Sequence, residues 1–114
     1  MQSNTAIAAL GALAQEHRLG AFRLLVQAGP DGLSAGVIAD GLGLAPSSLS
    51  FHLNHLAQAG LITQRRDGRS LIYAAEFGMT NQLVAYLVEN CCGGAGCAPG
   101  AVAMSPPNLE RIAS

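Results

Sequence analysis

The apolar residues in the first half of the chain recur three or four positions apart, which is the spacing of an amphipathic helix. Four segments with this pattern are predicted to be helices: residues 4–14, 15–28, 35–41 and 47–59. Ser34 and Ser47 are placed to cap the third and fourth helices, and Gly29 ends the second. The apolar faces expected from this spacing consist of Ile7, Leu10, Gly11, Ala14, Leu19, Phe22, Leu25, Val26, Val37, Ile38, Leu49, Leu53, Leu56 and Ala57.

The hydrophobic pattern changes after the fourth helix. Residues 61–66 and 70–74 are two short runs that read as strands, and Asp67-Gly68 between them is a strong hairpin signal, suited to a turn with positive φ. Residues 80–90 return to helical spacing and predict a last helix. Its apolar face consists of Leu83, Val84, Leu87 and Val88. The expected fold class is α+β and mostly helical, with four helices, a two-stranded β-hairpin and a fifth helix.

Two short helices joined by a tight glycine-containing turn and followed by an arginine-bearing hairpin are typical of a winged helix-turn-helix. The second helix of the pair, residues 47–59, is then expected to enter the DNA major groove. Its polar positions carry short hydroxyls and amides, which reach phosphates and base edges without charge. The candidate DNA-binding residues are Ser47, Ser48, Ser50, Phe51, Asn54, His55, Arg65, Arg66 and Arg69. Phe51 either contacts a thymine methyl or covers the helix edge.

An ordinary polar surface helix would show the same face, and the adjoining arginines favour the DNA-binding interpretation. The chain has a net charge of −1, with six cationic residues, all of them arginine. Three of these lie between residues 65 and 69, and such a cluster can bind a polyanion locally. A twofold dimer would place two such helices in successive major grooves, so the expected partner is double-stranded DNA with an inverted repeat.

The composition predicts one folded domain with a different tail. The chain has 114 residues, of which 50% are hydrophobic and 11% charged, so it can form a packed core. From residue 93 onward Gly, Pro and Ala dominate. We therefore expect a DNA-binding and dimerisation domain over residues 1–90 and a loose, cysteine-containing tail over residues 91–114.

Other function classes find little support in the sequence. The longest apolar run, residues 6–14, is shorter than the roughly 20 residues that cross a bilayer. No positive charge precedes an apolar run at the start of the chain, so we expect a cytoplasmic protein with no membrane partner. No nucleophile motif, phosphate-binding glycine loop or paired acids occur, so no enzyme is expected.

The three cysteines, Cys91, Cys92 and Cys97, lie within seven residues of one another in the segment CCGGAGC. An odd number of cysteines cannot form a closed set of disulfides within one chain. In a reducing compartment a tight group of thiols indicates metal binding or redox sensing. The pair His52 and His55, three positions apart, is also a conceivable ligand pair, although packing of His52 against the helix core is the stronger interpretation.

The segment SSLSFHLNHLAQAGLITQRRDGRSLIYAA, residues 47–75, resembles the signature of the ArsR/SmtB metal-sensing repressors. The matching positions are Ser50, His52, Leu53, Leu56, Ala59, Gly60, Leu61, Arg66, Gly68, Arg69 and Tyr73. Upstream, HRLGAFRLL over residues 17–25 resembles the start of the second helix in that family, and the likeness covers residues 5–90. The resemblance implies a homodimeric winged-helix repressor that releases its operator when a metal or metalloid binds.

Two of the family's metal sites are absent from this sequence. The third helix, SAGVIADGL, carries no thiol, and the last helix, TNQLVAYLVEN, has Glu89 as its single acid and no histidine. What remains are Cys91, Cys92 and Cys97, and this arrangement resembles the arsenic-sensing members whose thiols lie near the C-terminus.

The chemistry of three thiols favours the same inducer. Soft thiolates select soft metals and metalloids, structural Zn²⁺ requires four ligands, and As(III) or Sb(III) takes three thiolates in a pyramid. Cys91 and Cys92 are neighbours in sequence, so they converge only if the helix ends there. Glycines 93, 94 and 96 would let Cys97 return to them. Alternatives are a thiol redox switch, a sensor of Cd(II) or Pb(II), and a metal-buffering protein; no organic cofactor is expected.

Overall fold

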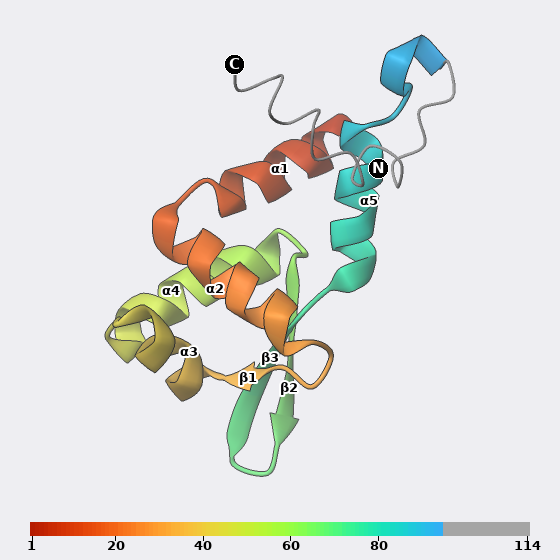
Figure 1. Cartoon of the computed structure of the whole chain (residues 1–114). Helices are drawn as coiled ribbons and strands as arrows, with labels where there is room; N and C mark the ends of the chain where they lie inside the picture. Colours follow the sequence, from red (N-terminus) through yellow and green to blue (C-terminus); the bar gives the residue numbers. More distant parts are fainter. Residues whose placement is uncertain (95–114) are drawn as a thin grey trace. The chain divides into compact units, whose positions relative to one another are not determined.

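A computed structural model describes residues 1–94 and divides the chain into two compact units, Met1–Leu83 and Val84–Ser114. The elements in chain order are α1 (Ser3–Leu13), α2 (Glu16–Ala28), β1 (Leu33–Ser34), α3 (Ala35–Leu42), α4 (Pro46–Gln58), β2 (Ile62–Asp67), β3 (Ser70–Ala75), α5 (Phe77–Leu87) and a short 3₁₀ turn (Cys91–Gly94) (Figure 1). This order confirms the mostly helical α+β fold with a hairpin wing. None of the described helices is long and apolar enough to cross a membrane.

The first four helices form where the periodicity predicts them, and two of their starts have identifiable caps. The Gln15 side chain accepts a hydrogen bond of 2.9 Å from the backbone N–H of Arg18, so α2 begins one residue later than expected. Ser34 caps α3 as predicted, accepting from the N–H of Val37 at 3.4 Å. The predicted cap at Ser47 is wrong. Ala45 is the N-cap residue of α4, because Pro46 fits the first helical position, where its missing N–H has no intrahelical partner to lose.

The turn between α3 and α4 gives the helix-turn-helix its compactness. Gly43 adopts a left-handed conformation with φ of 66°, which glycine adopts without a Cβ clash. The N–H of the following Leu44 reaches back to the carbonyl of Ala39 at 3.1 Å and closes the end of α3. The chain therefore reverses within three residues, and α4 packs against both α3 and α2.

The wing is a three-stranded antiparallel sheet with the order β1-β3-β2. Asp67 pairs with Ser70, so the hairpin turn consists of Gly68 and Arg69 and places Arg69 at the tip. In Figure 1 this hairpin extends away from α1–α4. The short strand β1, which pairs with β3, was not predicted.

Gly32 makes the pairing of β1 possible. Its φ is 73°, and a Cβ at this position would collide with the carbonyl oxygen of Tyr73 on β3. The chain can therefore approach β3 this closely only with glycine before β1. Tyr73 itself is buried.

The core of the first unit is aliphatic. Its fully buried large side chains are Leu25, Ile38, Leu49, Leu53, Leu56 and Leu61. Several residues expected on the apolar faces are instead exposed: Ile7 (66%), Leu10 (41%), Leu19 (44%), Val26 (39%) and Val37 (53%). On α1 the buried residues are Ala6, Ala9 and Ala12, so this helix packs through small side chains and its large ones face outward. Val37 lies about 100° around the helix from Ile38, and on α3 the buried residues are Ile38 and Ala39.

The last helix is shifted toward the N-terminus relative to its prediction over residues 80–90. The Glu76 carboxylate accepts a hydrogen bond of 3.0 Å from the N–H of Gly78, which helps α5 begin at Phe77. The helix ends at Leu87, and Asn90 has a φ of 60°, so the chain leaves the helical conformation just before the cysteines. Beyond the unit boundary, the Val84 and Leu87 side chains are 51% and 56% exposed.

Candidate nucleic-acid interface

Helix α4 has one buried face and one polar face. Leu49, Leu53 and Leu56 are at most 1% exposed and fix which side of the helix meets the core. The opposite side therefore faces outward. All the predicted DNA-binding residues of this helix are exposed, together with Gln58: Ser47, Ser48, Ser50, Phe51, Asn54, His55 and Gln58. Their assignment to DNA contacts stays a prediction.

Phe51 is the one large apolar side chain on this outer face of α4. It is 66% exposed, so it does not bury the helix edge against another element. Its ring meets the His52 ring edge-on, with the centroids 5.6 Å apart and the planes at 68°. The ring is therefore directed mostly to the outside, and both readings of Phe51 stay predictions.

His52 is half-buried and packs against the ring of His17 on α2, with the centroids 5.6 Å apart. Its Nδ1 atom is buried and has no hydrogen-bond partner among the described residues. Burial lowers the pKa of His52, and the nearby charges of Arg18, His17 and His55 lower it further. Both effects favour the neutral form of the His52 imidazole. The prediction that it packs rather than binds metal agrees with this position.

Arg18 has a structural role at the junction of α1 and α2. Its Nε donates a hydrogen bond of 2.6 Å to the carbonyl of Ala12, so the guanidinium ties the start of α2 to the end of α1. The same guanidinium is close enough to disfavour protonation of His52.

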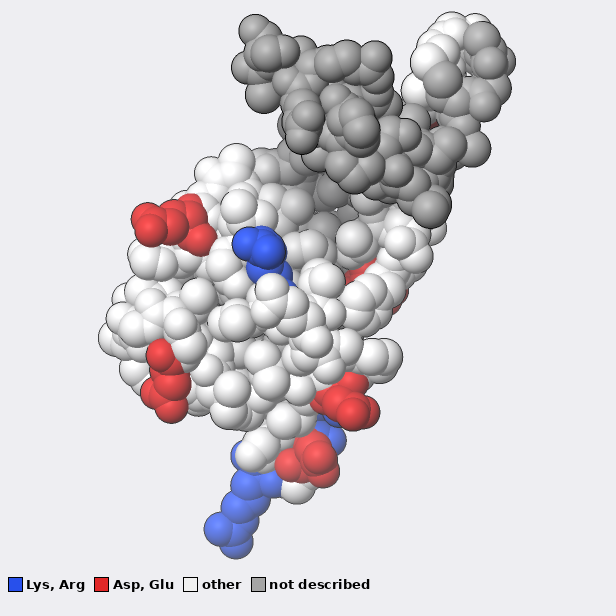
Figure 2. Space-filling model, viewed as in Figure 1, with Lys and Arg blue, Asp and Glu red and all other residues white. Residues whose placement is uncertain are grey.

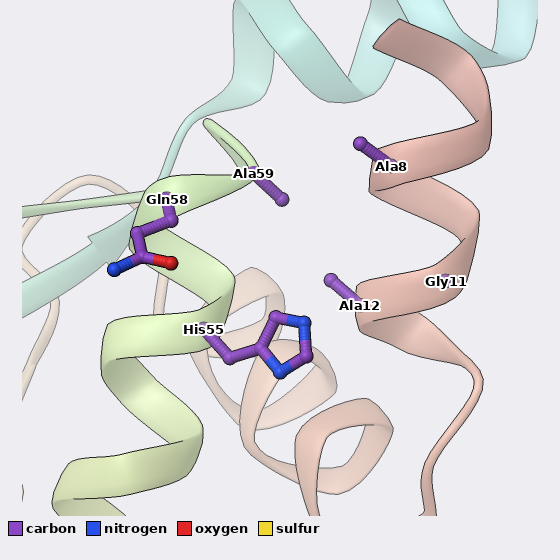
Figure 3. A pocket seen from close by; sticks show the side chains of 6 residues that line it. All are labelled: Ala8, Gly11, Ala12, His55, Gln58 and Ala59. Atoms are coloured by element: carbon purple, nitrogen blue, oxygen red, sulfur yellow. The ribbon is translucent and has the colours of Figure 1, made fainter. Parts of the chain in front are cut away.

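Two hollows lie along the exposed side of α4. The first, of about 390 Å³, separates α4 from α1, and the His55 ring points across it toward Ala12 (Figure 3). It is lined by Ala8, Gly11, Ala12, His55, Gln58 and Ala59. The second, of about 420 Å³, lies on α4 itself and is lined by Phe51, Asn54, His55 and Gln58. The outer face is thus concave, with one apolar ring and several polar groups at its rim. The contribution of α1 depends on tertiary packing and has no signal in the sequence.

The wing arginines have different environments. Arg66 and Arg69 are exposed, and Figure 2 shows cationic side chains gathered at the end of the molecule where Figure 1 draws the hairpin. Arg65 instead donates to the backbone carbonyls of Asp31 at 2.7 Å and Pro30 at 3.4 Å. Its guanidinium therefore holds β2 against the loop before β1, a role the sequence analysis missed. Its contact with DNA stays a prediction.

The segment after α5 brings two cysteine side chains together. The Sγ atoms of Cys91 and Cys92 are 3.6 Å apart. Cys92 has a φ of 57° and Gly93 a φ of 66°, so the chain has left the helix, which confirms the expectation that the helix must end for these neighbours to converge.

The predicted third ligand, Cys97, lies outside the described residues. Within residues 1–94 there is no group of three or more His, Cys, Asp or Glu side chains that could hold a metal ion. The pair His52 and His55 therefore gains no support as a metal site.

The turn between α3 and α4, the polar outer face of α4 and the arginine-bearing hairpin define a DNA-binding protein of the winged helix-turn-helix class. The sequence profile of a family described as "Helix-turn-helix domain" matches residues 13–65. The HTH-type transcriptional regulator YgaV of Escherichia coli strain K12 is 32% identical over 87 residues, which span 76% of this chain and 86% of YgaV. The chain belongs to the ArsR family of transcriptional regulators, which act by binding DNA and are not enzymes.

Solved structures agree with this assignment. An ArsR-like transcriptional regulator from Rhodococcus sp. RHA1 is 25% identical, with a TM-score of 0.67, covering 80% of this chain and 82% of that protein. A protein described as a possible transcriptional regulator for arsenical resistance is 29% identical, with a TM-score of 0.61. The match covers 69% of this chain and 79% of that protein. The fold described above is therefore shared with regulators of this family.

Proposed function

We propose that this ArsR-family regulator is an arsenite-responsive repressor. In this proposal it binds an inverted-repeat operator as a homodimer and leaves the DNA when As(III) or Sb(III) binds Cys91, Cys92 and Cys97. The observation that carries the proposal is the 3.6 Å separation of the first two Sγ atoms, at the point where the chain leaves the helical conformation. The likeness to a possible regulator for arsenical resistance adds support.

The donor set fits a metalloid better than a structural metal. Thiolates are soft ligands, and As(III) and Sb(III) complete their coordination with three of them, whereas structural zinc sites are closed by four. Cys97 would be the third ligand. Because each thiol must lose its proton to bind, the apparent affinity should rise with pH until the thiols are ionised.

Dimerisation is proposed from apolar faces that the single chain leaves exposed. In the first unit, α1 turns Ile7 and Leu10 outward and packs inward through alanines. In the second unit, the end of α5 exposes Val84 and Leu87. We assign both faces to contacts with a second copy of the chain. A twofold dimer would then set the two α4 helices about 34–36 Å apart, one turn of the DNA.

The inducer would act allosterically, because the thiols follow α5 in the chain and none lies on α4. Binding at the end of a dimerisation helix would change the relative orientation of the two recognition helices. Only a difference in metalloid affinity between the DNA-bound and free states can produce release. Typical couplings are about 1–3 kcal/mol, or about 5–150-fold in operator affinity.

A DNA-release titration tests this function. Reduced protein on a labelled operator is titrated with arsenite, antimonite, Cd²⁺ and Zn²⁺ while fluorescence anisotropy reports the bound fraction. The proposal predicts release by arsenite and antimonite at about one equivalent per site, with ultraviolet absorbance from thiolate ligation appearing in step. A parallel titration with peroxide addresses the redox alternative. Release by peroxide together with indifference to arsenite would overturn the metalloid assignment.

A further inference from the structure

Phe51 is a large apolar side chain that the isolated chain leaves mostly uncovered. The ring is 66% exposed, on the outer side of a helix whose inner side is filled by Leu49 and Leu53. A phenylalanine gains its stabilising effect from burial, and this one contributes little of it to the isolated chain. Its edge contact with the half-buried His52 restrains the ring in an outward position. The side chain is therefore presented to a partner and not to the core.

The surroundings of Phe51 show what kind of group could cover it. Asn54 and His55 are three and four positions further along, which places them on the same face of the helix. Together with Gln58 these side chains line the hollow of about 420 Å³. A partner that enters here meets an apolar ring on one side and an amide on the other. It must therefore offer an apolar group beside hydrogen-bonding atoms.

The DNA major groove offers this combination at one base pair. Thymine alone carries a C5 methyl group there, and its partner adenine presents the N7 acceptor and N6 donor that an asparagine amide can bind in a bidentate manner. Phe51 and Asn54 are separated along the helix axis by about 4.5 Å, from a rise of about 1.5 Å per residue. Base pairs follow one another every 3.4 Å or so, so the two side chains can reach the same or adjacent pairs.

We propose that Phe51 is a specificity-determining residue that reads the C5 methyl of a thymine in each half-site. In this arrangement Asn54 reads the adenine of the same or the neighbouring pair. The inference deepens the proposed function, since it rests on α4 being the recognition helix, and it does not depend on the response to arsenite. A cytosine at this position lacks the methyl and should be disfavoured.

The test removes the methyl group alone. The full-length protein first selects its operator from random duplex DNA, and each thymine of the selected half-site is then replaced in turn by deoxyuridine. Dissociation constants are measured by fluorescence anisotropy at fixed salt for the wild-type, Phe51→Ala, Phe51→Leu and Asn54→Ala proteins. Leu19→Ala serves as the matched control, because Leu19 is an exposed apolar residue on α2 and not on α4.

One thymine per half-site should prove sensitive. Wild-type protein should lose about fourfold in affinity for a single replacement and about 15-fold when both half-sites are changed, the loss expected for one buried methyl group in each. Phe51→Ala should bind the thymine and deoxyuridine operators equally. The control Leu19→Ala should prefer the thymine operator by the same ratio as the wild type. Asn54→Ala should keep the methyl sensitivity and lose discrimination at adenine. The thermodynamic cycle isolates the contact between ring and methyl.

Three results would overturn the proposal. The first is wild-type protein that binds every deoxyuridine operator as tightly as the thymine operator, and the second is Phe51→Ala protein that retains the full sensitivity to the methyl group. The third is Phe51→Ala protein that changes its oligomeric state in sedimentation and keeps its base preference, which would assign the ring to a protein contact. If Phe51→Ala binds too weakly to measure, Phe51→Leu completes the cycle with a smaller apolar side chain. Absence of any DNA binding by the wild type would contradict the recognition role of α4 itself, a separate failure.

Discussion

Replacing the arginine at the wing tip should change how DNA binding responds to salt. Arg69 lies in the two-residue turn of the hairpin and is exposed, so its guanidinium can meet a phosphate without rearrangement. Each phosphate neutralised by a protein cation contributes about 0.9 to the slope of log affinity against log salt. A homodimer presents two wings, so Arg69→Ala should reduce the slope by about 1.8. Between 50 and 200 mM salt, the wild type should therefore lose about 12-fold more affinity than the variant.

The assay is fluorescence anisotropy on the operator and on an unrelated duplex, over a series of KCl concentrations. Because phosphates are the same in every sequence, both DNAs should show the reduced slope. Arg23→Ala is the matched control, since Arg23 is exposed on α2 and its replacement removes the same charge away from the wing and α4. Its slope should equal that of the wild type.

An unchanged slope in Arg69→Ala would remove this residue from the interface. A loss confined to the operator would contradict phosphate binding in a different way, because it would mean that Arg69 reads a base. Unlike Arg69→Ala, Arg65→Ala is expected to lower the stability of the fold, since Arg65 also holds the hairpin through the carbonyls of Pro30 and Asp31. A lowered unfolding midpoint in Arg65→Ala would report that structural contribution.

Three further outcomes follow from the packing. The fold should lose stability as the pH falls below 6.5, the ordinary pKa of histidine. His52 in the unfolded chain takes up a proton there, whereas the lowered pKa of His52 in the fold disfavours that proton. Urea unfolding between pH 5 and 8 should show this slope, and His52→Gln should flatten it. Leu53→Ala, at a position 1% exposed, should cost roughly 2–5 kcal/mol in chemical denaturation, and a cost below about 1 kcal/mol would contradict its core position. Ile7→Asp combined with Leu10→Asp should convert the proposed dimer to a monomer in sedimentation velocity, and a dimer that stays intact would place the seam elsewhere.

The helical pattern predicted where helices form better than it predicted what they cover. Periodicity and turn residues gave α1–α4 within about two residues, because those signals are local. The same apolar spacing on α1 predicted a stripe that includes Ile7 and Leu10, and the fold leaves both exposed. An apolar stripe is the same in sequence whether it meets the core or a second chain, so only tertiary packing separates the two.

The unpredicted features depend on contacts between distant segments. Strand β1 has two residues, too few for alternation to show, and it forms because Gly32 lets the chain approach β3. The clamp by Arg65 joins positions more than thirty residues apart. The carboxylate of Glu76 helps α5 begin at Phe77, and a single carboxylate carries no periodic signal.

The outer face of α4 could be read from the sequence because an amphipathic helix fixes both sides at once. Once Leu49, Leu53 and Leu56 are assigned to the core, the exposed set follows, and the structure agrees for each member. The hollow that α1 forms with this face could not be read in the same way, since its lining residues come from two helices. For Cys91 and Cys92 the sequence predicted only that their side chains can converge if the helix ends before them.

The central claim is that the thiols at the end of the chain sense arsenite, and replacing all of them is its most direct test. The protein with Cys91→Ser, Cys92→Ser and Cys97→Ser keeps nearly the same side-chain shapes without soft ligands. Its operator affinity, measured by fluorescence anisotropy, should equal that of the wild type, and arsenite should no longer release it from the DNA. Release of the triple variant by arsenite, at the concentration that releases the wild type, would contradict the account and place the sensing site elsewhere.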